Sequence, residues 1–262
     1  MSGDGGHILH FPQPFSFEAG RDYDFLRRGA LDTSWNNAFR RFAEVILAPY
    51  ERAALGFRID GSENIDVFDQ GGAVVVCNHV NMLDCTFLEF AFPYKRTYFT
   101  TLESNFRIPV VRHLIRWLGA MPIPGSVSGM IGFKKAAVEA VKGGDCVIFY
   151  PESVLWPYYN GLRRFSPGAF EIACGAGVPV IPAVITFSGG KGIFALKRKP
   201  CVRMTVLPPI MPDGEGREAA GRLCDRCHAE MERAIAGINQ KNGAPDDSFA
   251  YIKDGRLRHG GR

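Results

Sequence analysis

Residues 72–84 read GAVVVCNHVNMLD, and this stretch decides the fold. Its first part, Gly72–Cys77, is a short apolar run rich in valine, as is typical of a strand buried on both faces. The part after it is polar and leads into a helical pattern at Leu83–Phe92. A strand, a short turn and a helix form the repeating unit of parallel sheets, so the stretch predicts an α/β domain.

The same alternation continues along the chain. Strand-like runs occur at Thr97–Thr101, Cys146–Tyr150, Val178–Phe187 and Val202–Leu207, and helical patterns occur at Pro109–Leu118, Val127–Val141 and Gly216–Gln240. This order predicts a mainly parallel sheet that helices cover on both faces. Pro182 falls inside one of the predicted strands and lacks a backbone N–H group, which predicts an edge position or a bulge.

The N-terminal part differs from this pattern. Residues 1–60 are expected to form an arm with an amphipathic helix, residues 61–240 the main domain, and residues 241–262 a flexible tail. The apolar positions of the helix recur at helical spacing from residue 34 to residue 55, and Pro49 should bend or break it. The stripe consists of Trp35, Phe39, Phe42, Ile46, Tyr50 and Ala53. Such a stripe either lies in a membrane interface or packs on the domain.

Composition narrows the class of protein. An apolar content of 46% in 262 residues supports a folded core, and neither a membrane span nor a signal peptide is recognised. The seven cysteines predict buried thiols in a reducing compartment. The haem-attachment spacing occurs once, in Cys224-Asp-Arg-Cys227-His228. This segment lies in a helical pattern, so we reject it as a haem site. We expect a cytosolic protein or one that lies on the inner membrane surface.

Charge is distributed unevenly along the chain. The segment Lys95–Pro212 carries 15 Lys or Arg against 5 Asp or Glu, a balance of +10, whereas the whole chain carries +4. Such a segment favours contact with an anionic group, such as a phosphate, an acidic carrier protein or an anionic lipid, although a solvated basic face would look the same. No nucleic-acid-binding module is recognised, so nucleic acid is not an expected partner.

The turn after the first strong strand contains the candidate catalytic residues. His79 follows the strand directly, and Asp84 lies five residues later at the predicted first turn of a helix. A histidine on such a turn can take a proton from a hydroxyl group while the carboxylate holds its other nitrogen protonated. Of the six histidines, only His79 has an aspartate at this offset.

Four motifs in order resemble the phospholipid/glycerol acyltransferase family, which includes 1-acylglycerol-3-phosphate acyltransferase. The first matches Asn78-His79-x4-Asp84, and the second is similar to Arg107-Ile108-Pro109 followed by Leu118–Pro124. The third, Phe-Pro-Glu-Gly-Thr-Arg in the family, resembles Tyr150-Pro151-Glu152-Ser153-Val154-Leu155, with Ser166–Phe170 downstream. The fourth resembles Gly177–Val184. The resemblance covers about residues 70–210, and it implies a mixed α/β sheet flanked by helices, a glycerolipid acyltransferase-like fold.

The resemblance also implies a reaction. His79 would deprotonate the acceptor hydroxyl, Asp84 would orient His79, and the acyl group would come from acyl carrier protein or coenzyme A. No metal and no bound cofactor are expected. Asn81 and Glu152 are expected to bind substrate, and backbone N–H groups of the 79–84 turn are expected to stabilise the oxyanion. The product would be a diacyl lipid, which implies a peripheral enzyme on the cytoplasmic face of an anionic membrane.

The sequence departs from the family where arginines are thought to hold the acceptor phosphate. Gly125 and Leu155 occupy those two places. Either Arg163 and Arg164, which lie just downstream, replace them, or the acceptor is a phosphate-free glycolipid or aminolipid. Trp156, Tyr158 and Tyr159 add an aromatic cluster that lines a headgroup or lipid-entry site or simply packs the loop. A lipid-binding protein without catalysis is the remaining alternative.

Overall fold

The computed structural model describes residues 14–66, 71–92, 96–190, 192–196 and 199–243, together with the short strands β8 (Ile252–Lys253) and β9 (Arg256–Leu257). Within these residues seven strands form one sheet in the order β1-β7-β6-β2-β5-β3-β4. Neighbouring strands are parallel except for β6 and β7, which confirms the predicted mixed, largely parallel sheet. The strands are β1 (Arg58–Asp60), β2 (Ala73–Cys77), β3 (Thr97–Leu102), β4 (Ala120–Ile123), β5 (Cys146–Phe149), β6 (Val180–Ser188) and β7 (Cys201–Val206).

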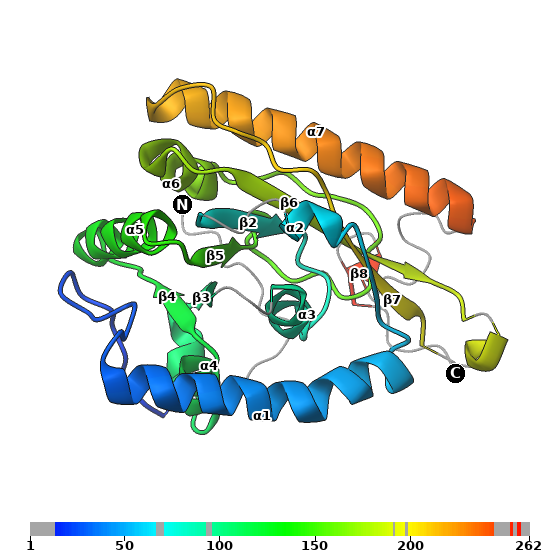
Figure 1. The fold of residues 1–262 in the computed structure, drawn as a ribbon, viewed down its shortest axis with the longest axis horizontal. Coiled ribbons are helices and arrows are strands. Elements are labelled where there is room, and N and C mark those ends of the chain that lie inside the picture. The colour runs from blue at the N-terminus through cyan, green and yellow to red at the C-terminus, as the bar shows by residue number, and fades with distance from the viewer. Residues whose placement is uncertain are drawn as a thin grey trace.

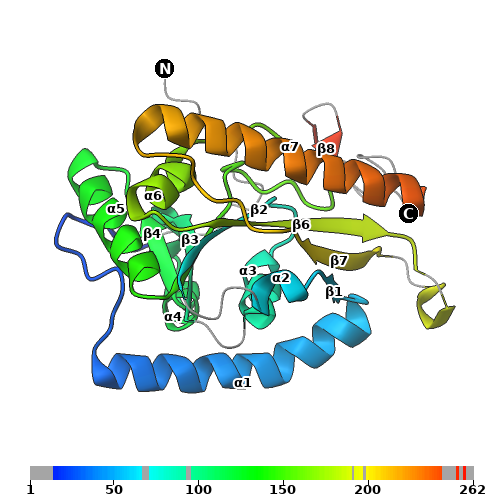
Figure 2. The ribbon, with the colours of Figure 1, turned by 45° about the horizontal axis from the view of Figure 1, so that its top comes forward.

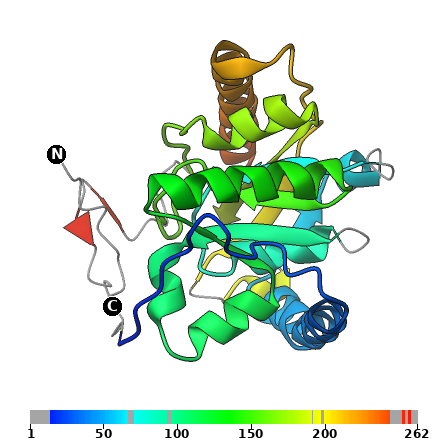
Figure 3. The ribbon, with the colours of Figure 1, turned by 90° about the vertical axis from the view of Figure 1, so that its left-hand side faces the viewer.

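Helices cover both faces of the sheet, as predicted (Figures 1 and 3). One face carries α5 (Val127–Lys142), α6 (Gly168–Ala176) and α7 (Gly216–Asn242). The opposite side carries α1 (Ala30–Ala54), α3 (Asp84–Ala91) and α4 (Val111–Trp117), and the short elements are α2 (Glu63–Asp66), η1 (Glu103–Arg107) and η2 (Gly192–Phe194).

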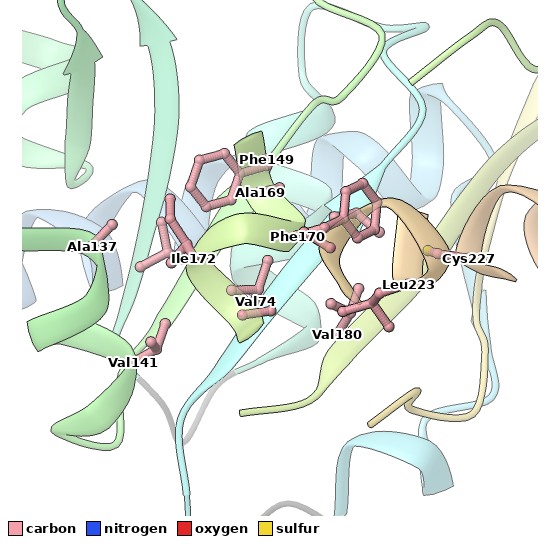
Figure 4. Packing of buried hydrophobic residues seen from close by; sticks show 14 of the residues in the cluster. Val74, Ala137, Val141, Phe149, Ala169, Phe170, Ile172, Val180, Leu223 and Cys227 are labelled. Carbon is pink, nitrogen blue, oxygen red and sulfur yellow. The ribbon is translucent and has the colours of Figure 1, made fainter. Parts of the chain in front are cut away.

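Strand β2 lies at the centre of the sheet, between β6 and β5, and every residue of it is buried. Val74 points to the side of α5, α6 and α7, where it packs with Phe170, Val180 and Leu223 (Figure 4). Val75, on the other side, belongs to the cluster that includes residues of α3. Side chains of a strand alternate between the two faces, so an uninterrupted valine run fills both cores at once.

Pro182 lies inside the sheet and not at its edge. It is paired with Val76 of β2 on one side, and the β6–β7 ladder begins at the next residue, Ala183. Val180 pairs with Ile210, and Ala183 pairs with Val206. Two residues lie between Val180 and Ala183, whereas three lie between Val206 and Ile210. The extra residue opposite Pro182 is the predicted bulge, which accommodates the missing N–H group.

Helix α1 agrees with the expectation that Pro49 bends or breaks it. It continues for five residues beyond Pro49, and Figure 2 shows its last turns angled away from the line of its first part. The predicted apolar stripe faces outward: Trp35, Phe42, Ile46 and Tyr50 are each at least half exposed. Most of the stripe therefore does not pack on the domain, although the rings of Trp35 and Phe39 contact Trp117 of α4 (5.8 and 5.1 Å between centroids). The buried residues of α1 are mainly polar: Asn36, Ala43 and Glu51.

Polar contacts on that buried face attach α1 to the domain. The guanidinium of Arg40 forms an ion pair with Glu89 of α3 (Nε–Oε1 3.3 Å) and donates to the carbonyl groups of Leu118 (3.0 Å) and Thr97. Leu118 ends α4, so one arginine joins α1 to α3, α4 and β3.

Two expectations concern regions that are only partly described. The end of α7 lies at Asn242, so residue 241 and residue 242 are helical. The remainder of the predicted tail lies outside the described residues except for Gly243, β8 and β9, as do residues 1–13 of the predicted arm. The described part contains no helix that is long and apolar enough to cross a membrane, and no group of metal-binding side chains is found there.

Glu51 generates a prediction about pH. Its buried side chain (Oε1) lies 2.6 Å from Thr86 Oγ1, which also lies 2.8 Å from the carbonyl oxygen of Leu83. A hydroxyl group has one proton, so Thr86 serves both contacts only if Glu51 is protonated. Burial raises the pKa of Glu51 to about 7, against the effects of Thr86 and Arg52.

A raised carboxyl pKa means that the stabilising, neutral form is fully present below the unfolded value and is lost as pH rises through 7. We expect Glu51→Gln to have a midpoint of thermal unfolding a few degrees above wild type at pH 8.5 and no advantage at pH 4.5. Glu44→Gln, on the exposed face of the same helix, is the control. A constant difference between Glu51→Gln and wild type across this pH range would contradict the assignment.

Candidate active site

The predicted catalytic residues lie at the centre of the sheet, at the carboxyl ends of two paired strands. His79 follows β2, and Glu152 follows β5, its parallel neighbour. Loops at this edge of a parallel sheet are the usual place for reactive groups, because the loops from adjacent strands meet there. Residues more than 70 positions apart in the sequence therefore come together.

His79 and Asp84 form the predicted pair. His79 Nδ1 lies 3.0 Å from Asp84 Oδ2, and the same oxygen accepts the N–H groups of Val80 (2.8 Å) and Asn81 (3.0 Å). Asp84 is the first residue of α3 and is 1% exposed, whereas the side chain of His79 is 28% exposed. With Nδ1 held by the carboxylate, Nε2 is the nitrogen that remains for a substrate.

Burial raises the pKa of Asp84, and the hydrogen bonds from His79, Asn81 and Val80 act in the opposite direction. A buried carboxylate at the start of a helix gains from each of these donors, and a positive imidazolium would add to them. Asp84 is therefore placed to stabilise an imidazolium that forms on His79. A general base needs a partner in this position.

Glu152 is brought to the site as predicted, but its oxygens are used by the protein. Oε2 accepts the N–H group of His79 (3.2 Å), and Oε1 accepts the N–H group of Arg163 (2.9 Å). The guanidinium of Arg163 also reaches Oε2 (3.4 Å). Glu152 is 6% exposed, so its described contacts fix the loop after β5 to the His79 turn.

The two arginines have different surroundings. Arg163 folds back toward Glu152: its Nη2 donates to the carbonyl groups of Glu152 and Val154, and its guanidinium lies 4.7 Å over the ring of Trp156. Arg164 is exposed. Of the two arginines, only Arg163 therefore lies against the loop that carries Glu152 and Leu155.

Asn81 and its neighbours are engaged in the turn itself. The side-chain oxygen of Asn81 accepts the N–H group of Leu83 (3.0 Å), and its own N–H group goes to Asp84. The N–H groups of His79 and Val80 are also bound within the protein. These four N–H groups are thus unavailable for the oxyanion, and the expectation that the turn supplies them is wrong for these positions.

The aromatic loop lies directly on the His79 turn. The N–H group of Trp156 donates to the carbonyl oxygen of His79 (2.8 Å), and that of Tyr158 donates to Val80 (2.9 Å). Ser153 and Tyr158 have positive φ angles of 66° and 60°. Ser153 occupies the place where the family motif has glycine, the residue that adopts this conformation most easily.

Two asparagines at this edge were not identified from the sequence as structural residues. β6 extends beyond the end of β2, and the fully buried side chains of Asn78 and Asn160 bind its free edge. The amide of Asn78 pairs with both backbone groups of Ile185 (2.8 and 2.9 Å), and that of Asn160 pairs with both of Phe187 (2.6 and 2.8 Å). Each asparagine thus replaces a strand residue.

Comparison with known proteins agrees with the geometry. A model of the Acyltransferase family matches residues 56–186, a range that contains His79, Asp84, Glu152 and Arg163. The chain belongs to this family. It is similar to 1-acyl-sn-glycerol-3-phosphate acyltransferase BAT2, chloroplastic, of Brassica napus (33% identity, 68% of this chain, 50% of that protein).

Further relatives extend the comparison. A 1-acyl-sn-glycerol-3-phosphate acyltransferase of Salmonella typhimurium is 26% identical over 71% of this chain and 76% of its own length. The chain thus spans half of the Brassica relative and about three quarters of the Salmonella one. The crystal structure of the 1-acyl-sn-glycerophosphate (LPA) acyltransferase PlsC from Thermotoga maritima has the same fold (TM-score 0.54, 21% identity, 82% of this chain, 90% of that chain).

The asparagine pairs lead to a prediction about stability. Asn78→Ala would leave a buried N–H and a buried C=O group of Ile185 without partners, each at a cost of about 1–3 kcal/mol. We expect a loss of about 2–4 kcal/mol in the free energy of unfolding, measured by urea denaturation. Asn37→Ala, at an exposed position of α1, is the control. Equal small losses in both variants would show that Asn78 does not hold β6.

Proposed function

We propose that the protein transfers a fatty acyl group from an acyl thioester to a hydroxyl group of a lysophospholipid or related glycerolipid, with 1-acylglycerol-3-phosphate as the first candidate acceptor. The observation that carries the proposal is the His79–Asp84 pair, with 3.0 Å between Nδ1 and Oδ2 and Nε2 left for substrate. The names of the relatives support the same acceptor.

The reaction follows from the pair. His79 Nε2 takes the proton of the acceptor hydroxyl, and Asp84 stabilises the imidazolium through Nδ1–H. The acceptor oxygen attacks the thioester carbonyl carbon, and the tetrahedral intermediate then expels the thiolate, which receives the proton back from His79. The donor is acyl carrier protein or coenzyme A loaded with an acyl chain. The step requires neither a metal nor a bound cofactor.

Arg163 supports a phosphate-bearing acceptor. It is the arginine that approaches Glu152, and Glu152 in turn contacts the backbone of His79. A guanidinium oriented by a carboxylate and an aromatic ring is pre-organised to bind a phosphate oxygen with its remaining N–H groups. Arg164 lacks these contacts among the described residues, so we assign no role to it.

A phosphate-free glycolipid or aminolipid acceptor is the second candidate. Leu155 and Gly125 replace the family's arginines, and Trp156 and Tyr158 lie against the His79 turn. Such a surface would accept a headgroup without a phosphate. A lipid-binding protein without catalysis is less well supported, because binding alone gives no reason for a buried carboxylate that holds an exposed histidine.

The outward face of α1 supports a peripheral location on a membrane. Leu31, Trp35, Phe42, Val45 and Ile46 are all exposed, while the buried face carries Arg40 and Glu51. An apolar stripe on the solvent side of a helix is typical of interfacial helices. We propose that this face lies on an anionic bilayer, at the cytoplasmic side, with the basic central segment nearby.

A prediction about His79 tests its role as the general base. His79→Ala should lower kcat by a factor of about 10²–10⁴ or more, and Asp84→Asn should also be severely impaired because it favours the wrong tautomer of the imidazole. Release of thiol from an acyl thioester in the presence of lysophosphatidate is the assay, and thermal unfolding confirms the fold. His113→Ala, on exposed α4, is the control. Retention of more than about a tenth of the activity by His79→Ala would exclude the mechanism.

The second prediction separates the two arginines. Arg163→Gln should raise the KM for 1-acylglycerol-3-phosphate by about one to two decades and leave the KM for the phosphate-free 1-acylglycerol nearly unchanged. Arg164→Gln is the matched control and should change neither value. A similar increase for both acceptors would mean that Arg163 only supports the loop. A wild-type preference for the phosphate-free acceptor would favour the second candidate.

The third prediction tests the membrane surface. Binding to vesicles with anionic lipid should weaken at high salt and in a variant with Trp35→Ser, Phe42→Ser and Ile46→Ser, measured by co-sedimentation. Val127→Ser with Ile131→Ser removes exposed apolar side chains from α5 and is the control. Unchanged binding by the α1 variant would place the contact elsewhere, and absence of binding at low salt would refute the location.

A further inference from the structure

The side chain of Tyr150 stacks on the candidate base. Its ring lies against the imidazole of His79, with 4.4 Å between the ring centroids and 26° between the planes. It is the last residue before Pro151 and Glu152 in the third motif, at the place where the motif has phenylalanine. The ring therefore agrees with the family pattern, whereas the hydroxyl group is a feature of this chain.

The hydroxyl group lies in an unusual environment. It is buried, and among the described residues it has no hydrogen-bond partner. Asp84 offers a matching feature: Oδ2 accepts three donors, but Oδ1 is buried and has none within the same residues. Burial, followed by the neighbouring Cys85, Asp84 and Cys77, raises the pKa of Tyr150 well above its usual value. The hydroxyl group thus keeps its proton and is a permanent donor near an acceptor that lacks one.

We propose that Tyr150 is a positioning residue for the His79–Asp84 pair, with the ring holding the imidazole and the hydroxyl group serving Asp84 Oδ1. The proposal rests on the proposed role of His79 as general base. The two atoms form no direct hydrogen bond, so the contact that we propose requires a rotation of the tyrosine ring or a bridging water molecule. No covalent step is involved, and the residue acts only through its neighbours.

The two parts of the side chain act on the pKa of His79 in opposite directions. A donor on Oδ1 withdraws charge from the carboxylate, so its removal strengthens the attraction between Asp84 and the imidazolium and raises the pKa of His79. The face of an aromatic ring stabilises a neighbouring cation, so removal of the ring lowers the pKa of His79. A tyrosine that only packed against His79 would not shift the pKa of His79 in opposite directions when its hydroxyl group and its ring are removed in turn.

The experiment is an NMR titration of the His79 imidazole in the full chain, with its signal identified by its loss in His79→Ala. Tyr150→Phe keeps the ring and should raise the pKa of His79 by about half a unit, whereas Tyr150→Leu, which loses the ring as well, should have a pKa about half a unit or more below that of Tyr150→Phe. Tyr98→Phe is the matched control, because it removes the hydroxyl group of another buried tyrosine, which donates to Leu26, and it should leave the titration unchanged.

The NMR titration does not require catalysis, so its result can be interpreted even if the proposed function is wrong. If the acyl-transfer assay works, the acid limb of kcat/KM should move with the NMR value in each variant. An unchanged titration in Tyr150→Phe would remove the hydroxyl group from the proposal, and a value in Tyr150→Leu equal to or above that in Tyr150→Phe would remove the ring. Should Tyr150→Leu fail to fold, Tyr150→Met replaces it, and the result for Tyr150→Phe decides the role of the hydroxyl group alone.

Discussion

The carboxylate of Asp84 is the interaction on which the site depends. One oxygen of this side chain holds the backbone of Val80 and Asn81 and the imidazole of His79. The turn between β2 and α3 is therefore shaped around a single buried acceptor at the start of a helix. A charge in this position would be unfavourable without donors, so the fold of the turn and the orientation of His79 are two consequences of satisfying it. An offset of five residues fits because His79 lies before the helix and not on it.

A second layer of polar contacts holds the loop from β5 against this turn. Glu152 binds the backbone of His79, while Asn78 and Asn160 bind the part of β6 that extends beyond β2. Parallel strands of unequal length leave N–H and C=O groups exposed at the end of the shorter strand. Side-chain amides satisfy those groups without another strand at this edge. Structural and candidate catalytic residues are thus adjacent in the first motif for a physical reason.

The sequence contains the local part of this arrangement and not the long-range part. The valine run, the turn and the offset of His79 and Asp84 are local, and the structure has each of them where it was predicted. The partners of Pro182, Asn160 and Arg163 depend on which strands become neighbours, and pattern alone does not define that order. Every residue except proline has a backbone N–H group, so the sequence does not show which of these groups already have a partner. The prediction that the turn would stabilise an oxyanion therefore did not take account of Asp84 and Glu152, which bind those groups.

The sequence also does not predict which face of helix α1 is buried. The same helix connects the exposed apolar surface to the candidate active site. Apolar spacing identifies an amphipathic helix, but it does not say which face turns inward. Here the inward face carries polar groups with defined partners, because Arg40 pairs with Glu89 and Glu51 pairs with Thr86, both on α3. Buried polar groups need defined partners, so this packing fixes the rotation of α1 and leaves its apolar stripe outside. Since α3 begins with Asp84, the helix that presents the apolar surface is bonded directly to the helix that supports the candidate base.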